Sequence, residues 1–551
     1  MGRASAETEQ EGQQGGQRKA PREGLTMRAL GWIERVGNKL PNPFWLFILL
    51  AAATAVLSWI LAQAGVTVTN PADGEEVPVK NLLSGEGILE MITEAIPNFM
   101  TFPPLGLVIT VLLGVAVAEQ AGLISACLRG AVTKVSPKLL TFVVALAGIV
   151  GSVAADALYV ILPPLAALAF KAVGRSPIAG VVVAFAGVAG GFNASLLLTP
   201  TDALLAGLST SAAEIVEPGY VVSPIANWYF SAASAVMLAF VITLVAETLL
   251  AKRMKLLDET PIDEEAAKSN ALATDEQAER AEEATEEAEK DFEDLDAMQL
   301  EPQERRGIWV SLLATAAFLA LFLTALAWPG SPLRGEDGGI VTSPVLLNIG
   351  IIIMLSFVVA GVAYGLVAGT ITAFDDIPKF MTKGMLEMAP VLVLFFAASQ
   401  FIAWFASSNI GTVLAVNGSE LLDRSGMHPL AMLALVVAMT FLINTLITSG
   451  SAQWALMAPV IVPALLLVGI SAETTQMAYR IGDSASNIIS PLSPYFALIL
   501  GYLQKYRRDA GVGTLISLTL PLSIAIVLSW FAFFVLWWVL GLPLGPGNPI
   551  R

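Results

Sequence analysis

The chain has 551 residues, of which 55% are hydrophobic and only 14% are charged. A soluble protein of average composition carries about 25% charged residues, so this composition excludes an ordinary soluble protein. Apolar stretches of roughly 20 residues follow one another, which predicts an all-α polytopic membrane protein and not a β-barrel, whose strands are short and alternate in polarity.

The net charge of −16 arises in one segment. Residues 258–304 hold 19 Asp and Glu against 3 Lys and Arg, which accounts for the whole net charge. The segment has few large apolar residues, so we expect 256–306 to be a solvated cytoplasmic linker between two membrane halves, 41–255 and 307–551. An acidic interaction segment is the alternative.

Residues 1–40 are polar and lack the apolar core of a signal peptide. They carry several Lys and Arg, and such residues flanking membrane spans stay on the cytoplasmic side. We therefore expect a cytoplasmic N-terminal tail on a multi-pass membrane protein.

Lys and Arg in the short loops orient the first half. Residues 44–64 are expected to cross outward, 105–127 inward, and 220–251 inward to the linker. The stretch 139–170 begins and ends near Lys and Arg, so we expect a re-entrant helical hairpin. Residues 177–208, interrupted by Gly and Pro, are then expected to cross outward as a broken helix.

The second half repeats this organisation from the opposite face. Spans are expected at 308–328, 341–369, 386–408, 477–504 and 510–541, with a loop at 409–427 and a hairpin at 428–470. The span 477–504 is broken like its counterpart. The result is nine transmembrane helices and two hairpins in an inverted-topology repeat.

One pattern occurs in both broken helices. Asn193, Pro200 and Gly207 recur with the same spacing as Asn487, Pro494 and Gly501. Irregular backbone at membrane depth must be buried in protein or line a wet cavity. Paired hydrophobic segments that are broken at corresponding places indicate the binding site of a secondary transporter.

The charged residues in these units are candidates for binding and coupling, because a charge at membrane depth costs at least about 2.5–3.5 kcal/mol. Arg480 and Asp483 are three apart and share a helix face. Arg480 would hold a substrate carboxylate while Asp483 binds a cation or proton. The alternative is a structural ion pair between these two residues. Asp156 and Asp202 in the first half are candidate proton carriers.

Several uncharged side chains complete the candidate site. Asn193 is a candidate for binding substrate, and the amide oxygens of Asn444 and Asn487 suit a hard cation such as Na⁺. The alternative for these asparagines is that they only satisfy the backbone of the broken helices. Trp454 lies inside the second hairpin, where stacking on an aromatic substrate competes with the usual role of an interfacial anchor.

Other chemistry finds no support in the sequence. We see no nucleotide-binding loop, no nucleophile–base constellation, no cluster of metal ligands and no basic patch for nucleic acid. We therefore expect no enzyme activity and no cofactor other than a coupling ion, Na⁺ or H⁺.

Long motifs resemble the AbgT family. They are Asn444-Thr445-Leu446-Ile447-Thr448-Ser449-Gly450-Ser451-Ala452-Gln453-Trp454-Ala455, Tyr479-Arg480-Ile481-Gly482-Asp483-Ser484, Ser490-Pro491-Leu492-Ser493-Pro494, and Thr199-Pro200-Thr201-Asp202. The resemblance runs from about 28 to 541, apart from the acidic linker. By this resemblance the functional residues are Asp202, Ser451, Trp454, Arg480, Asp483 and Pro491, with Asn444 and Asp483 near a Na⁺ site.

The resemblance implies ion-coupled transport of p-aminobenzoyl-glutamate or sulfonamide antimetabolites by alternating access, in a bowl-shaped homodimer surrounded by lipid. A Na⁺-coupled dicarboxylate carrier is the alternative within transport, since paired hairpins occur there too. A channel or an integral membrane enzyme is less favoured.

Overall fold

The computed structural model describes residues 43–69, 76–133, 135–154, 157–259, 261–262, 299–335, 338–340 and 343–551. The predicted N-terminal tail, most of the acidic linker and the candidate proton carrier Asp156 lie outside these residues.

The first half is a series of helices with one small β-hairpin. In order, its elements are α2 (Pro43–Gln63), β1 (Thr67–Thr69), β2 (Glu76–Pro78), α3 (Gly85–Thr93), α4 (Ala95–Met100), α5 (Pro103–Gln120), α6 (Leu123–Thr133), α7 (Leu140–Val150), the 3₁₀ turn η1 (Gly151–Ala154), α8 (Ala157–Ala172), α9 (Pro177–Val188), α10 (Pro200–Ala213), α11 (Trp228–Val245), the π-helical turn η2 (Ala246–Leu250) and α12 (Ala251–Glu259). The two strands pair antiparallel, with Val68 opposite Val77.

In the described residues of the second half, all the elements of regular secondary structure are helices. Its helices are α15 (Pro302–Ala327), α16 (Pro344–Leu347), α17 (Gly350–Ala368), α18 (Asp376–Ser407), α19 (Ile410–Ser425), α20 (Pro429–Asn444), α21 (Gly450–Leu467), α22 (Ala472–Asn487), α23 (Pro494–Tyr506) and α24 (Val512–Leu540).

Within the described residues, eight helices are long and apolar enough to cross a membrane. Seven coincide with predicted spans: α2, α5, α11 continued through η2 and α12, α15, α17, the C-terminal part of α18, and α24. The eighth, α21, lies in the predicted second hairpin. These helices confirm the polytopic all-α fold, while the count of nine spans and the re-entry of the hairpins stay predictions.

The two remaining predicted spans are interrupted, as expected. The chain leaves α9 at Val188 and enters α10 at Pro200, and it leaves α22 at Asn487 and enters α23 at Pro494. Proline suits the first position of a helix, because its φ is already helical and its missing N–H is not needed there. Thr-Pro and Ser-Pro in the sequence therefore mark where each second half-helix begins.

The predicted hairpins differ in how their two helices pack. Both α7 and α8, which η1 joins, pack against α9. In the second unit α20 packs mainly on α22, whereas α21 packs mainly on α10 and α19. The second pair of helices is therefore splayed around α22.

The helices form two hydrophobic cores that meet at α22. One core joins α7, α8, α9, α11, α23 and α24, and the other joins α2, α5, α10, α18 and α21. From α22, Met477 and Ile481 enter the first core and Tyr479 enters the second. A polar side chain on α22 thus lies between two packed bodies.

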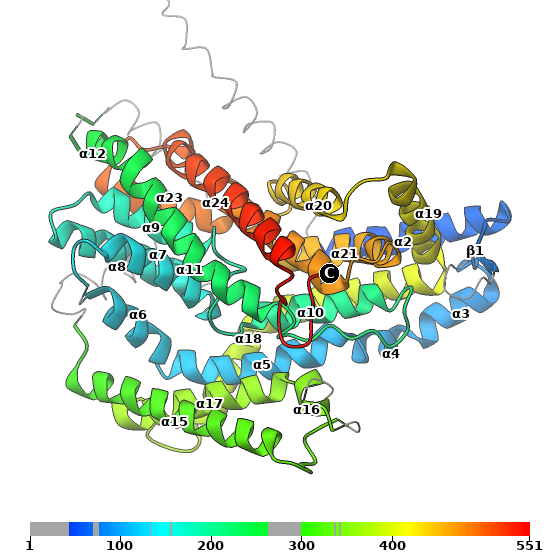
Figure 1. Ribbon diagram of the computed structural model, residues 1–551, viewed down its shortest axis with the longest axis horizontal. Helices are drawn as coiled ribbons and strands as arrows, with labels where there is room; N and C mark the ends of the chain where they lie inside the picture. The colour runs from blue at the N-terminus through cyan, green and yellow to red at the C-terminus, as the bar shows by residue number, and fades with distance from the viewer. Residues whose placement is uncertain are drawn as a thin grey trace, which may run out of the picture.

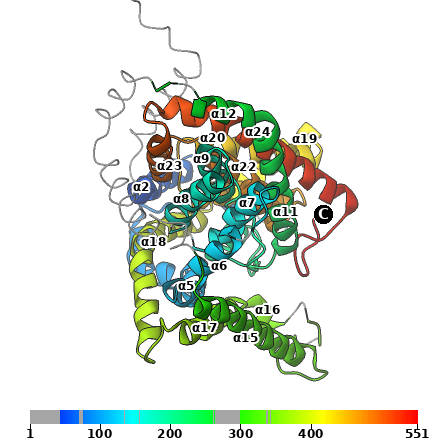
Figure 2. The same ribbon diagram turned by 90° about the vertical axis from the view of Figure 1, so that its left-hand side faces the viewer.

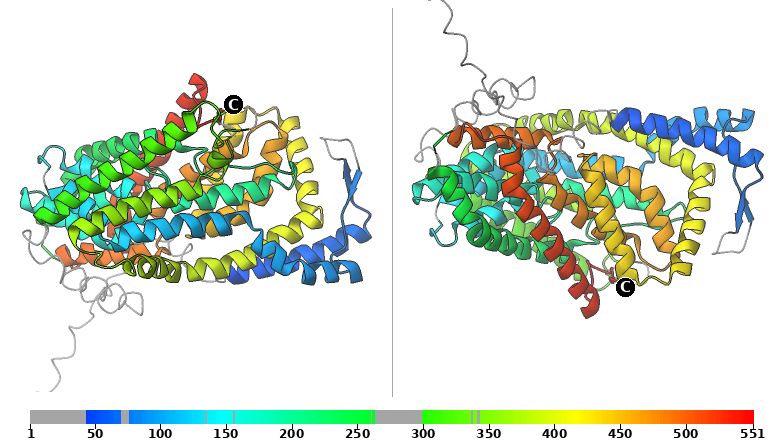
Figure 3. Two further views of the ribbon diagram at one scale, coloured as in Figure 1. Left: turned by 90° about the horizontal axis from the view of Figure 1, so that it is seen from below. Right: turned by 90° about the horizontal axis from the view of Figure 1, so that it is seen from above.

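The figures show the same division. In Figure 1, α7, α8, α9, α11 and α23 occupy one end of the molecule, and α2, α19 and α21 the other. Helices α15 and α17 lie side by side along one edge, where α17 packs on α5 (Figures 1 and 2). The β-hairpin protrudes at the far end in both views of Figure 3.

Two segments that lie between predicted spans contain short helices. Segment 65–104 holds α3 and α4, and α3 begins where Ser84 Oγ accepts a hydrogen bond from Gly87 N–H. Segment 409–427 holds α19, and Gly426 follows it in the left-handed conformation. Helix α19 exposes Glu420, Asp423 and Arg424, so its mean hydropathy does not reveal it. The span expected at 105–127 also ends early, because Gly122 turns the chain at a φ of 84°.

Candidate functional site

The candidate residues meet around α22, where α10, α20, α21 and the connection 189–199 all approach it. Polar side chains follow one face of α22 at helical spacing: Glu473, Gln476, Arg480, Asp483 and Asn487. The first four are buried. Such a polar stripe between two apolar cores needs partners for its hydrogen bonds and charges.

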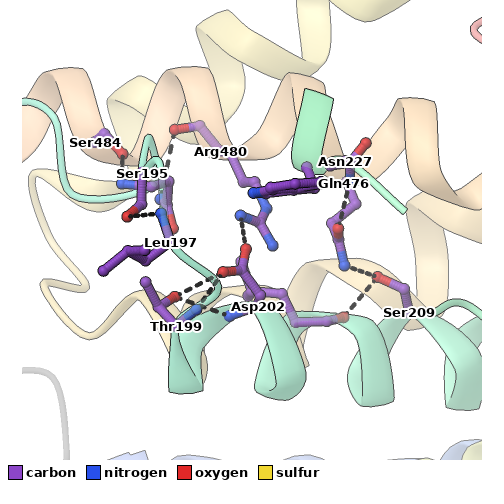
Figure 4. Close-up of polar contacts among 12 residues, drawn as sticks. Ser195, Leu197, Thr199, Asp202, Ser209, Asn227, Gln476, Arg480 and Ser484 are labelled. Atoms are coloured by element: carbon purple, nitrogen blue, oxygen red, sulfur yellow. Dashed lines mark hydrogen bonds and ion pairs between the residues drawn. The ribbon is translucent and has the colours of Figure 1, made fainter. Parts of the chain in front are cut away.

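Arg480 and Asp202 form a buried ion pair across α22 and α10. Arg480 Nη1 lies 2.5 Å from Asp202 Oδ1, and the two residues are 2% and 7% exposed. Asp202 Oδ2 accepts hydrogen bonds from the backbone N–H of Thr199 at 2.7 Å and from its hydroxyl at 2.9 Å. Asp202 N–H donates in turn to Thr199 Oγ1 at 3.3 Å, which completes a capping box at the start of α10, and together these bonds fix the carboxylate beneath Arg480 (Figure 4).

The guanidinium of Arg480 retains hydrogen-bonding capacity. Its Nε has no hydrogen-bond partner in the described part of the chain. A planar guanidinium binds a carboxylate best through two parallel bonds. In this structure the Nε–H group of Arg480 is therefore still without a hydrogen-bond acceptor. The ion pair considered between Arg480 and Asp483 is not the one that forms.

Asp483 instead faces the connection 189–199. Asn193 Nδ2 donates to Asp483 Oδ2 at 2.6 Å, and Asn193 N–H donates to Ser484 Oγ at 3.0 Å. The carboxylate also lies against the first residue of α21, because a Cβ added at Gly450 would come within 3.1 and 3.2 Å of its two oxygens. Asp483 thus sits at the N-terminal end of α21, where a negative charge is favoured.

Asn444 ties the end of α20 to the end of α22. Its Nδ2 approaches Asp483 O at 2.9 Å, Ser486 Oγ at 2.9 Å and Asn487 Oδ1 at 2.8 Å. The structure therefore brings together Asn444, Asn487 and Asp483, which the sequence assigned to ion coupling.

Three buried oxygens in this cluster have no partner among the described residues: Asn193 Oδ1, Asn444 Oδ1 and Asp483 Oδ1. A buried acceptor without a hydrogen bond costs about 1–3 kcal/mol. One carboxylate and two amide oxygens form the donor set that a hard monovalent cation prefers. The residues present fit a Na⁺ ion at this place. No group of three or more His, Cys, Asp or Glu that would suit a transition metal occurs in the described residues.

Trp454 is fully buried in α21 and not at an interface. Its Nε1–H donates to Ser209 Oγ at 3.0 Å, and its ring lies 4.4 Å from that of Tyr479, centroid to centroid. Tyr479 in turn donates its hydroxyl hydrogen to Gly450 O at 2.6 Å. These contacts exclude the reading of Trp454 as an interfacial anchor in this structure. The ring belongs to the same polar and aromatic cluster as Arg480.

Two further candidates lie at the edges. Ser451 is half-buried in the first turn of α21, with its hydroxyl 3.2 Å from that of Ser449. Pro491 is half-buried in the break between α22 and α23.

The sequence did not lead us to expect a hydrogen-bonded chain of two amide side chains and one hydroxyl beside Trp454. Asn227 Nδ2 donates to Gln476 Oε1 at 2.6 Å, and Gln476 Nε2 donates to Ser209 Oγ at 3.0 Å, as Figure 4 shows. The available signals were helical spacings: Gln476 precedes Arg480 by four residues, and Ser209 follows Asp202 by seven.

The fold and this site define a multi-pass helical membrane transport protein, because broken helices in such a protein enclose a charged, hydrogen-bonded site between two packed bodies. The profile of the "AbgT putative transporter family" matches residues 28–284 and 279–551. The chain belongs to this family.

Relatives of known sequence and structure agree. The p-aminobenzoyl-glutamate transport protein of Escherichia coli K12 is 35% identical over 518 residues, covering 94% of this chain and 96% of that protein. The YdaH transporter of Alcanivorax borkumensis superposes with a TM-score of 0.81 at 38% identity, over 92% of this chain and all of that one. MtrF of Neisseria gonorrhoeae, described among antimetabolite efflux pumps, superposes with a TM-score of 0.84 at 37% identity, over 95% of this chain and all of that one.

Proposed function

We propose that this protein is an ion-coupled secondary transporter that moves p-aminobenzoyl-glutamate, or related aromatic carboxylates and sulfonamide antimetabolites, across the bacterial inner membrane. Its relatives bear the names of a p-aminobenzoyl-glutamate transporter and an antimetabolite efflux pump. The buried ion pair between Arg480 and Asp202 is the observation that carries the proposal for this chain.

Arg480 binds a carboxylate of the substrate in this account. In the closed structure Asp202 occupies that position through Oδ1. When the site opens and substrate enters, the substrate carboxylate replaces Asp202, which keeps its two bonds to Thr199 and so remains satisfied on one oxygen. The charge on Arg480 is neutralised in both states, and this allows the site to close with or without substrate.

The aromatic ring of the substrate binds beside Trp454. Tyr479 covers Trp454 in the closed state, so α21 and α22 must separate for a substrate ring to stack there. Ser451 lies on the first turn of α21 and Asn193 on the connection that reaches α22, so both can contact the substrate when these helices separate. Pro491 keeps the following segment from continuing α22 as a helix.

The coupling ion binds beside the substrate. Asp483, Asn444 and Asn193 each carry a buried oxygen that has no hydrogen-bond partner in the described part of the chain, and Asn487 orients Asn444 by accepting a hydrogen bond from it. A bound Na⁺ would supply the positive charge that Asp483 lacks. Proton coupling is the other form of the same proposal, with Asp483 or Asp156 as the carrier.

Alternating access follows from the placement of α22. It packs against both cores, and hinge-like breaks flank it at residues 468–471 and 488–493. Movement of one core against the other therefore opens the site to one side. We place the N-terminus in the cytoplasm and expect a homodimer in the membrane.

Flux into proteoliposomes tests the proposal. The purified protein is reconstituted, Na⁺ and pH gradients are imposed separately, and accumulation of p-aminobenzoyl-glutamate is compared with that of a sulfonamide and of a C4 dicarboxylate. We expect accumulation of the aromatic compounds under at least one gradient. Accumulation of the dicarboxylate alone would favour a dicarboxylate carrier, and equal flux with and without gradients would refute ion coupling.

A further inference from the structure

Glu473 is a buried carboxylic acid that the mechanism above does not use. The residue is 6% exposed, and in the described residues no Lys, Arg or His forms an ion pair with it. Its Oε2 accepts a hydrogen bond from the hydroxyl of Tyr220 at 2.7 Å. An ionised carboxylate so placed is costly, and such a group tends to take up a proton instead.

Glu473 belongs to the helix that carries the proposed site. It occupies the first turn of α22, which Ser471 caps by accepting a hydrogen bond from Thr474 N–H. Seven residues separate it from Arg480, which at 1.5 Å per residue is about 10 Å along the same helix face. Gln476 lies between them. Any movement of α22 that opens the site therefore also moves Glu473.

Two segments outside the helix bundle cover the Glu473 side of α22. One is the connection 214–227, which supplies Tyr220. The other is the C-terminal segment 541–551, which turns back after α24: Thr474 Oγ1 donates to Ile550 O at 3.1 Å, and Ile550 is 2% exposed. Neither segment is among the helices that are long and apolar enough to span a membrane, so separation of either from α22 would break no span.

The charged groups around Glu473 do not neutralise the charge that its ionised carboxylate would carry. On the connection 214–227, Glu217 is exposed and adds a repulsive charge. Among the helices that pack on α22, α10 contributes Asp202, which Arg480 already pairs, while α20, α21 and α24 contain no ionisable side chain. His428 precedes α20 and is exposed. In the C-terminal segment, the guanidinium of Arg551 lies against Gly541.

We propose that Glu473 is a proton-exchanging group of the transport cycle. In the closed state its carboxyl group holds a proton. When the covering segments separate from α22, the O–H bond breaks and the proton passes to water, leaving a carboxylate that the N-terminus of α22 stabilises. Closure takes a proton back from water. This inference rests on the proposed function, because it concerns the same cycle.

A matched set of variants tests it in proteoliposomes. Full-length wild-type protein, Glu473→Gln and Glu217→Gln are compared for accumulation of p-aminobenzoyl-glutamate driven by a pH gradient, and for counterflow, which needs no net proton movement. We expect Glu473→Gln to lose the response to the pH gradient and to keep counterflow. Glu217→Gln removes the neighbouring repulsive charge but leaves the carboxyl group of Glu473, so it is expected to keep both the response to the pH gradient and counterflow.

Each outcome decides the question. If Glu473→Gln responds to the pH gradient as the wild type does, the inference is overturned. It is also overturned if flux through the wild-type protein depends on the Na⁺ gradient and not on the pH gradient, although the proposed function then stands. No flux under either gradient rejects the proposed function itself. If Glu473→Gln does not fold, Tyr220→Phe replaces it: loss of the hydrogen bond must move the midpoint of the pH profile, and an unchanged midpoint overturns the inference.

Discussion

Arg480 of α22 and Asp202 of α10 form an ion pair at 2.5 Å in which both residues are almost completely buried. They are 278 residues apart in sequence and come from the two halves of the repeat. The pair links the second broken helix to the first at the point where the two hydrophobic cores meet. The pair therefore holds the two broken helices together in this structure.

Replacing Arg480 tests its role as the carboxylate-binding group. Arg480→Ala leaves Asp202 buried and unpaired, and we expect a loss of about 3–5 kcal/mol in stability. Arg480→Lys keeps the charge and the fold but loses the planar fork, so we expect it to lose p-aminobenzoyl-glutamate transport with only a small fall in Tm.

Flux and Tm measured on the same preparations separate these effects. Arg424→Ala is the control, because Arg424 forms an exposed pair with Glu420 on α19 and should change neither quantity. Wild-type flux in Arg480→Lys would contradict the bidentate role of Arg480.

Asp483→Asn tests the coupling site. Asparagine keeps the shape of the side chain and can still accept the hydrogen bond from Asn193, so the fold should persist. The charge that favours a cation is lost, and we expect transport to become independent of the driving ion. Flux at varied Na⁺ and varied pH measures this dependence, and an unchanged dependence on both ions would exclude Asp483 as the coupling residue.

A methyl group at Gly450 should disturb the same site without changing any charge. An added Cβ meets the Asp483 oxygens at 3.1 and 3.2 Å, which is tighter than ordinary contact. We expect Gly450→Ala to displace the carboxylate and weaken ion dependence. Gly501→Ala is the matched control, since nothing lies within 4 Å of a Cβ there. Equal ion dependence in the two variants would argue against close packing of α21 on Asp483.

Ser209→Ala tests the chain beside Trp454. The hydroxyl accepts hydrogen bonds from Trp454 and Gln476, and without it two buried donors lose their acceptor. We expect a loss of about 1–3 kcal/mol in stability. Ser529→Ala is the control, because that hydroxyl bonds only within its own helix, and its Tm should stay near that of wild type. A similar Tm for both variants would mean that the hydrogen bonds to Ser209 do not stabilise the packing of α21 against α10 and α22.

Much of the fold could be predicted from local sequence. Apolar stretches located seven of the long helices, and Thr199-Pro200 and Ser493-Pro494 located the starts of α10 and α23. Helices in polar segments, such as α19, were not predicted, because mean hydropathy does not reveal an amphipathic helix with one solvated face. The splayed packing of α20 and α21 depends on tertiary contacts that no local pattern encodes.

The sequence predicted which residues gather at the candidate site, but not which of them contact one another. A charge within an apolar stretch identifies Asp202, Arg480 and Asp483 one by one. Spacing on one helix left open a structural ion pair between Arg480 and Asp483, but in the fold Arg480 pairs with Asp202 and Asp483 accepts a hydrogen bond from Asn193. These partners come from the other half of the chain, so only the assembled structure reveals them.

Binding of p-aminobenzoyl-glutamate to purified wild-type protein, Asp202→Asn and Arg480→Lys, measured by isothermal titration calorimetry, tests most directly whether the substrate carboxylate replaces Asp202 at Arg480. The account predicts that Asp202→Asn binds more tightly than wild type, by about tenfold if the competing carboxylate contributes about 1.4 kcal/mol, and that Arg480→Lys binds weakly or not at all. Equal weakening in Asp202→Asn and Arg480→Lys would contradict it, because Asp202 would then contact the substrate itself.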